Sequence, residues 1–277
     1  MPMIETRDGT SLYVKDWNSG GTEGTIVLIH GWPLNADSWE YQAVPLANAG
    51  YRVISYDRRG FGRSEQPWHG YDYDTLSDDL ADVMSGCVVT RATIAGFSMG
   101  GGEVARYMSR HGGKGVEKAM LISSVVPYML KTDDNPDGVP EETFKEITDG
   151  LKDDRPGFLR SFFKDFYGIG MVKHPLSDAA LDWTMMMAMM ASPRATLACG
   201  DAFAHTDFRS DLRAFNVPTL VLHGTGDKIV PIDVSSRQAA KMIGSNAKLI
   251  EYDSAPHGLT ATHHEKLAED MVAFLRA

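Results

Sequence analysis

Short apolar, β-branched runs alternate with helical patterns along most of this 277-residue chain, and this alternation limits its fold more than any other feature. Several of the runs are hydrophobic at every position, which is typical of strands covered on both faces of a parallel sheet. The runs are Ser11–Trp17, Thr25–His30, Arg52–Asp57, Ala92–Phe97, Ala119–Ser123, Thr219–His223 and Lys248–Tyr252. The helical patterns between them include Glu40–Ala49, Asp74–Met84, Gly101–His111 and His263–Arg276. This order predicts an α/β protein with a doubly wound, mostly parallel sheet.

The alternation stops between about residues 125 and 215, where the sequence contains no convincing strand. We therefore predict an α/β core formed by 1–124 and 216–277, with a helical cap insertion at 125–215. Apolar side chains recur there at every fourth position, and such stripes are typical of a packing face that, under a cap, also roofs a pocket. The helical patterns are Glu141–Gly150, Gly157–Tyr167, Ser177–Met190 and Pro193–His205, and the stripes are Phe158, Phe162, Phe166 and Leu181, Met185, Met189.

Composition and charge exclude several classes of protein. Lys and Arg number 27 against 37 Asp and Glu, and this net charge of −10 argues against nucleic-acid or anionic-membrane partners, which bind Lys and Arg clusters. Cys87 and Cys199 have neither the spacing of a metal site nor that of a disulfide framework. The N-terminal MPMIETRDGT is no secretory signal, and the apolar stretch 184–192 is too short to span a bilayer. We therefore expect a soluble, cytoplasmic protein without a metal ion.

One motif carries chemistry: Gly96-Phe97-Ser98-Met99-Gly100, placed at the end of the predicted strand 92–97 and at the start of the next helix. A G-x-S-x-G string is weak evidence alone. In the order strand, tight turn, helix, however, it is typical of a nucleophile elbow, in which glycines flank a serine held in a strained backbone conformation. We predict that Ser98 is a nucleophile.

A serine hydroxyl needs a base, and the base needs an orienting acid. In this type of fold the two partners follow the serine in the order acid, then histidine, each after a later strand. Asp227 follows the run 219–223 and His257 follows the run 248–252, so we predict them as the acid and the base. His223 lies inside a strand pattern, where a buried, hydrogen-bonded histidine is expected. Asp253 leaves the same strand as His257 and cannot face it across a cleft.

An oxyanion hole is expected beside the nucleophile. It would pair the backbone N–H of Met99 with an N–H from the loop after the strand ending at His30, and Trp32 is the predicted second donor. Each such donor stabilises the transition state by about 3–4 kcal/mol in serine hydrolases. The Trp32 indole is expected to line the pocket as well.

The motifs together resemble the α/β-hydrolase superfamily, and more narrowly its bacterial aryl esterases and cofactor-free haloperoxidases, or perhydrolases. The resemblance runs from about Ile4 to the C-terminus. It implies the α/β-hydrolase fold, a catalytic triad and oxyanion hole at the positions named above, no cofactor, and short acyl chains. It also suggests a substrate pocket built by Trp32, Pro33, Val125, Phe166, Phe203, Ile229 and Val230. The motifs that carry it are His30-Gly31-Trp32, Asp57 to Ser64, Gly96 to Gly102, Gly224 to Asp227 and Ala255-Pro256-His257-Gly258.

Pro33 bears on the reaction. Haloperoxidases in the family tend to have proline after the oxyanion-hole tryptophan, whereas plain esterases often have leucine. Proline fixes its own φ and pushes the preceding residue toward extended geometry, which would re-aim the Trp32 carbonyl toward the nucleophile. That carbonyl could accept a hydrogen bond from hydrogen peroxide attacking an acyl-enzyme, so we hypothesise that perhydrolysis gains on hydrolysis.

The leading prediction is a serine hydrolase that cleaves small carboxylic esters and makes peracids from hydrogen peroxide. An amidase or lactamase would use the same triad, and a hydroxynitrile lyase and a non-catalytic hydrolase-fold binding protein also stay open. A carboxylate nucleophile, as in dehalogenases and epoxide hydrolases, is disfavoured by Ser98. A dinucleotide site at 100–105 is disfavoured because no acidic residue follows the next strand. Whether the chain forms a homo-oligomer is left open.

Overall fold

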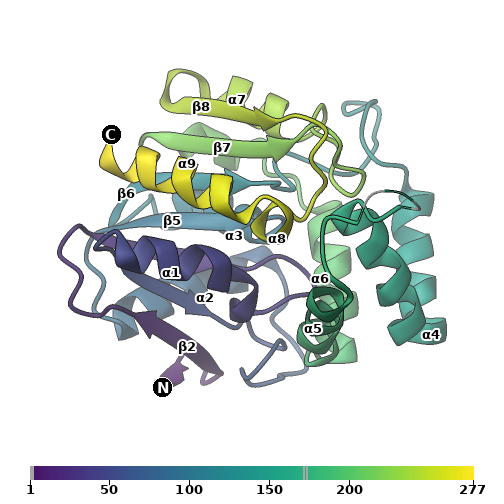
Figure 1. Cartoon of the computed structure of the whole chain (residues 1–277), viewed down its shortest axis with the longest axis horizontal. Coiled ribbons are helices and arrows are strands. Elements are labelled where there is room, and N and C mark those ends of the chain that lie inside the picture. The colour runs from purple at the N-terminus through teal and green to yellow at the C-terminus, as the bar shows by residue number, and fades with distance from the viewer. Residues whose placement is uncertain (1–2, 171, 173) are drawn as a thin grey trace.

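The described part of the chain forms one eight-stranded sheet (Figure 1). The computed structural model describes residues 3–170, 172 and 174–277. The strand order is β1-β2-β4-β3-β5-β6-β7-β8; β1 and β2 pair antiparallel, as do β2 and β4, and the remaining pairs are parallel. The bounds are β1 Met3–Glu5, β2 Ser11–Trp17, β3 Thr25–Ile29, β4 Arg52–Tyr56, β5 Ala92–Phe97, β6 Val116–Ile122, β7 Thr219–Gly224 and β8 Ala247–Tyr252.

The central strands are buried on both faces, which is why their sequences are apolar at nearly every position. All six residues of β5 and all six of β7 are buried. The predicted doubly wound, mostly parallel sheet is therefore confirmed, with each predicted strand found to within a few residues. The short edge strand β1 was not predicted, because three residues give too little alternation to be recognised.

Helices cover both faces of the sheet. Helices α1 and α9 pack together on the near face in Figure 1, and α2 and α3 pack together on the far face. In the core the helices are α1 Glu40–Asn48, α2 Tyr73–Gly86, α3 Met99–Arg110, α7 Ser236–Ile243, α8 Leu259–Thr262 and α9 His264–Arg276, with 3-10 turns at Ala36–Trp39, Asp211–Ala214 and Gly244–Asn246. Within the described ranges, no helix has the length and apolar character needed to cross a membrane.

The predicted helical insertion is confirmed between β6 and β7. Helices α4 to α6 gather at one end of the strands (Figure 1), and their bounds are α4 Glu141–Tyr167, α5 Asp178–Met189 and α6 Pro193–His205. Helix α4 is kinked at Asp154, where φ is −142° and ψ is 85°, so its two halves match the two separate helical patterns in the sequence. The limits 125–215 for a distinct cap stay a prediction.

Specific hydrogen bonds fasten the insertion to the core. The Trp32 indole N–H donates to the Thr196 carbonyl of α6 at 2.9 Å. The Ser192 amide donates to the Gly60 carbonyl at 2.8 Å, and the Gly258 amide donates to the Phe166 carbonyl of α4 at 2.8 Å. Two of these bonds attach to loops that carry predicted site residues, so the position of the insertion and the geometry of the site are linked.

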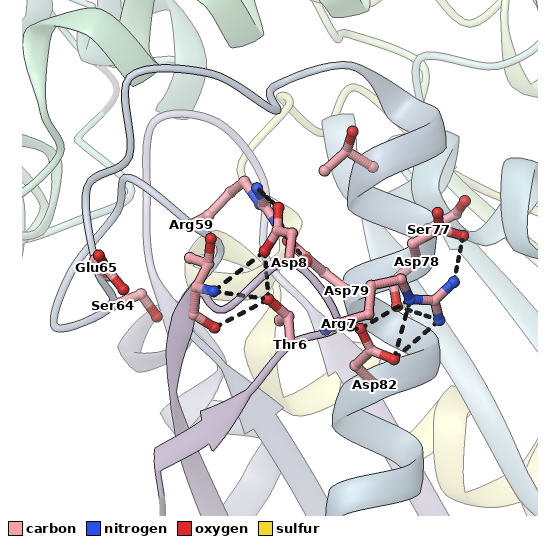
Figure 2. Close-up of polar contacts among 12 residues, drawn as sticks. Thr6, Arg7, Asp8, Arg59, Ser64, Glu65, Ser77, Asp78, Asp79 and Asp82 are labelled. Atoms are coloured by element: carbon pink, nitrogen blue, oxygen red, sulfur yellow. Dashed lines mark hydrogen bonds and ion pairs between the residues drawn. The ribbon is translucent and has the colours of Figure 1, made fainter.

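A polar cluster holds the N-terminal hairpin against α2, as Figure 2 shows. The Arg59 guanidinium is only 2% exposed and donates two hydrogen bonds of 2.6 Å to Asp79, whose side chain is 3% exposed. It also donates to Asp8 at 2.8 Å. On the surface beside this cluster, Arg7 pairs with Asp82 at 2.9 Å. The buried pair fixes the loop that follows β4 to helix α2.

Candidate active site

Ser98 lies in the sharp turn between β5 and α3. Its backbone is in a left-handed region, with φ 54° and ψ −119°, as expected for a nucleophile elbow. The flanking glycines are required by close approach of the backbone. A Cβ at Gly96 would overlap the Gly100 carbonyl, and a Cβ at Gly100 would lie 2.5 Å from the Ile29 carbonyl oxygen. The turn therefore presents the Ser98 hydroxyl at the carboxyl end of the sheet.

The three predicted residues meet in one hydrogen-bonded chain. His257 Nε2 lies 2.9 Å from Ser98 Oγ. His257 Nδ1 lies 2.6 Å from Asp227 Oδ2. Asp227 follows β7 and His257 follows β8, and because these strands are parallel to β5 their carboxyl ends reach the same edge of the sheet. This arrangement can remove the serine proton and hold the resulting imidazolium beside a carboxylate.

The imidazole of His257 is fully buried and held by aromatic side chains. The ring of Phe166 contacts it edge-on at 4.7 Å between centroids, and the ring of Phe97 lies 5.3 Å away on a tilted plane. Ser98 is 6% exposed, so the hydroxyl stays reachable from the cavity while the base is shielded from bulk water. Shielding strengthens the electrostatic interactions within the site.

The Asp227 carboxylate has three hydrogen-bond donors and a second imidazole nitrogen in close contact. Oδ1 accepts from the backbone amides of Ile229 at 2.9 Å and Val230 at 2.8 Å. Oδ2 accepts from His257, and the Nε2 atom of His223 lies 3.0 Å from the same oxygen. Burial by itself raises the pKa of Asp227, but the neighbouring His257 and the hydrogen bond from His223 outweigh it and hold that pKa well below its usual range. The carboxylate is therefore ionised when His257 takes a proton.

A small apolar cavity opens on Ser98. Its volume is about 40 Å³. Of the residues predicted to line the pocket, Trp32, Val125, Phe166, Phe203, Ile229 and Val230 do so, together with Ser98 and His257. The cavity is therefore suited to a short apolar group bonded to the serine oxygen.

Comparison with known proteins places the chain in a family. Residues 24–263 match the family described as alpha/beta hydrolase fold. The chain belongs to the alpha/beta hydrolase family. It is 41% identical to the non-heme chloroperoxidase CPO-A1 of Kitasatospora aureofaciens over 99% of each chain, and 39% identical to the bifunctional esterase/perhydrolase DCH of Acinetobacter calcoaceticus over 100% of each. A bromoperoxidase structure from Bacillus anthracis superposes with a TM-score of 0.95 at 42% identity, covering 100% of this chain and 99% of that one.

The loop expected to supply the second oxyanion donor of this alpha/beta hydrolase lies directly against the elbow. A Cβ placed on Gly31 would be 3.0 Å from the Ser98 Cβ, so the 30–32 segment and the nucleophile are in close contact. Arg58 holds this segment from behind, because its side chain donates to the His30 carbonyl at 2.7 Å and pairs with buried Glu103 of α3. The backbone amides of Trp32 and Met99 are thus carried by two segments that are locked together.

Several residues that line the cavity of this alpha/beta hydrolase were not predicted from the sequence. They come mainly from the first half of α4 and the segment before it, where no regular spacing of apolar residues indicates which side faces inward. These residues are Met129, Val139, Thr143, Phe144 and Ile147. Phe162 also lines the cavity, and its place in the stripe with Phe158 and Phe166 was the one available signal. The Met185 position of the other stripe is buried in packing instead.

Pro33 is not among the described residues that line the cavity. It is buried directly after Trp32, and the peptide bond between them is cis. Its suggested effect on peroxide stays a prediction. Across the described part of the chain, no group of three or more His, Cys, Asp or Glu side chains is arranged to hold a metal ion.

Proposed function

We propose that this alpha/beta hydrolase cleaves small carboxylic esters through an acyl-enzyme and transfers the same acyl group to hydrogen peroxide. The observation that carries the proposal is the unbroken chain from Ser98 Oγ through His257 to Asp227, with distances of 2.9 Å and 2.6 Å. Full-length similarity to a protein named esterase/perhydrolase supports both halves of the reaction.

In the acylation step, His257 Nε2 takes the hydroxyl proton as Ser98 Oγ bonds to the ester carbonyl carbon. Asp227 stabilises the imidazolium that forms and keeps Nδ1 protonated. The negative oxygen of the tetrahedral intermediate accepts hydrogen bonds from the backbone amides of Met99 and Trp32. His257 then gives its proton to the leaving alcohol, and the acyl group stays on Ser98.

In the second step, water or hydrogen peroxide attacks the acyl carbon. His257 accepts the proton of the attacking molecule and returns it to Ser98 Oγ as the acyl–oxygen bond breaks. Water yields a carboxylic acid, and hydrogen peroxide yields a peracid. The peracid would oxidise halide in solution, so the haloperoxidase reaction needs no halide site on the protein.

The size and lining of the cavity support short acyl substrates. A small cavity of about 40 Å³ walled by Phe166, Phe203 and Val125 favours a small group such as acetyl over a long chain. Apolar walls favour uncharged acyl groups because a buried charge would have no partner there.

The first experiment tests together whether Ser98 is the nucleophile and which esters the protein cleaves. Wild-type protein is expected to react with a fluorophosphonate probe and to hydrolyse p-nitrophenyl acetate faster than longer esters, whereas Ser98→Ala does neither. A wild type that fails to take up the probe and releases no p-nitrophenol would favour a non-catalytic binding protein.

A second experiment addresses peroxide. Pro33→Leu is expected to lower the ratio of peracid formation to ester hydrolysis, because leucine removes the constraint on the Trp32 backbone. Peracid is measured by halide oxidation with hydrogen peroxide and acetate ester, and hydrolysis is measured without peroxide. An unchanged ratio would mean that Pro33 only shapes the turn.

We also propose a reducing compartment such as the cytoplasm as the place of action. Cys87 and Cys199 are free thiols that form no disulfide, and disulfides are rare in reducing compartments. Fractionation of the source cells, followed by probe labelling of each fraction, tests this; labelling confined to the secreted fraction would contradict it.

A further inference from the structure

A second imidazole touches the acid of the triad. His223, near the end of β7, is fully buried, and its Nε2 lies 3.0 Å from Asp227 Oδ2 and 2.8 Å from the Val230 carbonyl oxygen. On the other side of the ring, Nδ1 lies 2.6 Å from the hydroxyl of Ser236 on α7. Asp227 Oδ2 is therefore held between His223 and His257, although only His257 reaches the nucleophile.

The partners of the His223 ring settle where its hydrogen lies. Both neighbours of Nε2 are oxygen acceptors, so this atom must carry a hydrogen, which is bonded to the Val230 carbonyl and lies close to Asp227 Oδ2. The Ser236 hydroxyl is able to donate to Nδ1. A neutral ring with its hydrogen on Nε2 gives both ring nitrogens a suitable partner among the three neighbouring oxygens, as buried polar atoms require.

We propose that His223 is a positioning residue for the reaction, which fixes the Asp227 carboxylate in the orientation and charge state that His257 needs. This inference rests on the proposed hydrolase function. The same N–H also ties the Val230 carbonyl, whose residue supplies the backbone amide to Asp227 Oδ1 at 2.8 Å. One ring thus braces both the carboxylate and the turn that carries it.

Loss of the His223 N–H has a defined consequence for protonation. Without this N–H, fewer positive groups stabilise the negative charge of the buried Asp227 carboxylate. The Asp227–His257 pair therefore binds a proton more tightly. The enzyme is active only with His257 unprotonated, so activity would be lost at a higher pH than in the wild type. The expected shift is about one pH unit, the size of one hydrogen bond to a charged group.

Other charged groups near His223 are the same in every variant compared. Glu251 of β8 stands opposite His223 in the strand register and is paired with Arg237 of α7 at 2.6 Å. Lys228 beside Asp227 lies 3.6 Å from Asp165 on α4. These groups are on the surface, so salt screens them, and profiles recorded at high ionic strength isolate the buried pair.

The experiment compares two side chains of nearly equal shape, His223→Gln and His223→Met. Glutamine brings an amide N–H close to the position of Nε2, and methionine brings none. We expect kcat of the Met variant on p-nitrophenyl acetate to fall about 30-fold with KM within twofold, and the acidic midpoint of its pH profile to rise by about one unit. The Gln variant is expected to keep kcat within about threefold and the wild-type midpoint.

Proton NMR gives a readout that does not need ester turnover. The low-field resonance of the His257 Nδ1 hydrogen should titrate about one pH unit higher in the Met variant than in the wild type. If the wild type hydrolyses no ester, the proposed function fails, but the NMR titration still decides the role of His223. Equal losses in the Gln and Met variants with unchanged midpoints would overturn the positioning role and leave His223 as packing.

Ser236→Ala is the variant that leaves His223 in place. Without the hydroxyl donor, the ring hydrogen stays on Nε2, because both neighbours of that atom are acceptors. A wild-type midpoint of the pH profile is therefore expected, with thermal unfolding close to wild type. If the Met variant does not fold, the Gln and Ser236→Ala variants carry the test, and a raised midpoint in Ser236→Ala, or a loss of kcat in Gln well beyond threefold, would contradict the proposal.

Discussion

The nucleophile turn packs tightly against the end of β3, so adding one methyl group at Gly100 is predicted to have a large effect on stability and activity. A Cβ at Gly100 would lie 2.5 Å from the Ile29 carbonyl oxygen and 3.0 Å from that of His30, and both are backbone atoms that no rotamer change can move away. Ordinary contact begins near 3.4 Å, so Gly100→Ala must separate the start of α3 from the end of β3, which leads directly into the loop that carries Trp32 (the oxyanion loop), by about 0.9 Å. Overpacking of this kind costs about 2 kcal/mol of the free energy of unfolding.

The displacement falls on the catalytic geometry itself. Met99 and Trp32, whose amides are the proposed oxyanion donors, lie on the two segments that would be pushed apart, and a misplacement of about 1 Å can lower the rate about 100-fold. We therefore expect kcat/KM of Gly100→Ala on p-nitrophenyl acetate to fall by about that factor, and Tm to fall by roughly 5 °C.

Gly200 offers a matched control for the same substitution. It lies inside α6, where an added Cβ would meet no atom within 4 Å. Gly200→Ala is expected to leave kcat/KM unchanged and to stabilise the protein by about 1 kcal/mol, because alanine is the better helix former. Wild-type kinetics and Tm in Gly100→Ala would refute the claim that the elbow and the oxyanion loop are held in contact.

Two further predictions concern stability and substrate range. Asp79→Asn leaves buried Arg59 without its closest counter-charge (Figure 2), so the free energy of unfolding measured in urea should fall by about 3 kcal/mol. The control Asp82→Asn removes a more exposed ion pair and should cost less than about 1 kcal/mol. Equal effects would mean that burial does not set the contribution of the pair. Phe203 forms a wall shared by the catalytic cavity and an outer cleft of about 350 Å³ between α4 and α6. Phe203→Ala should therefore raise the ratio of kcat/KM for p-nitrophenyl octanoate over acetate at least about tenfold. An unchanged ratio would show that another side chain closes the cavity.

The placement of the three triad residues was predictable because each depends on local rules. Ser98 is marked by glycines that only a strained turn requires, and its φ of 54° bears this out. Asp227 and His257 follow buried strands, and parallel strands bring their carboxyl ends to one edge whatever the details of packing. Strand, turn and order along the chain were sufficient to expect these residues together.

The tertiary structure decided which residues line the cavity and that His223 contacts the Asp227 carboxylate. Thr143, Phe144 and Ile147 line the same cavity as Ser98 through the way in which kinked helix α4 is placed, and no spacing in the sequence marks that face. His223 was recognised only as a buried histidine, since a strand pattern gives burial but not the partner of each ring nitrogen.

The sequence by itself thus determined the sheet, the serine turn and the order of acid and base, because buried strands and strained turns have residue requirements that can be read locally. Only the tertiary structure decided which side chains enclose the acyl group and that the Asp227 carboxylate lies between two imidazoles. Such contacts join residues through the docking angle of a helix or the turn of a loop, and these are set by packing of the whole chain.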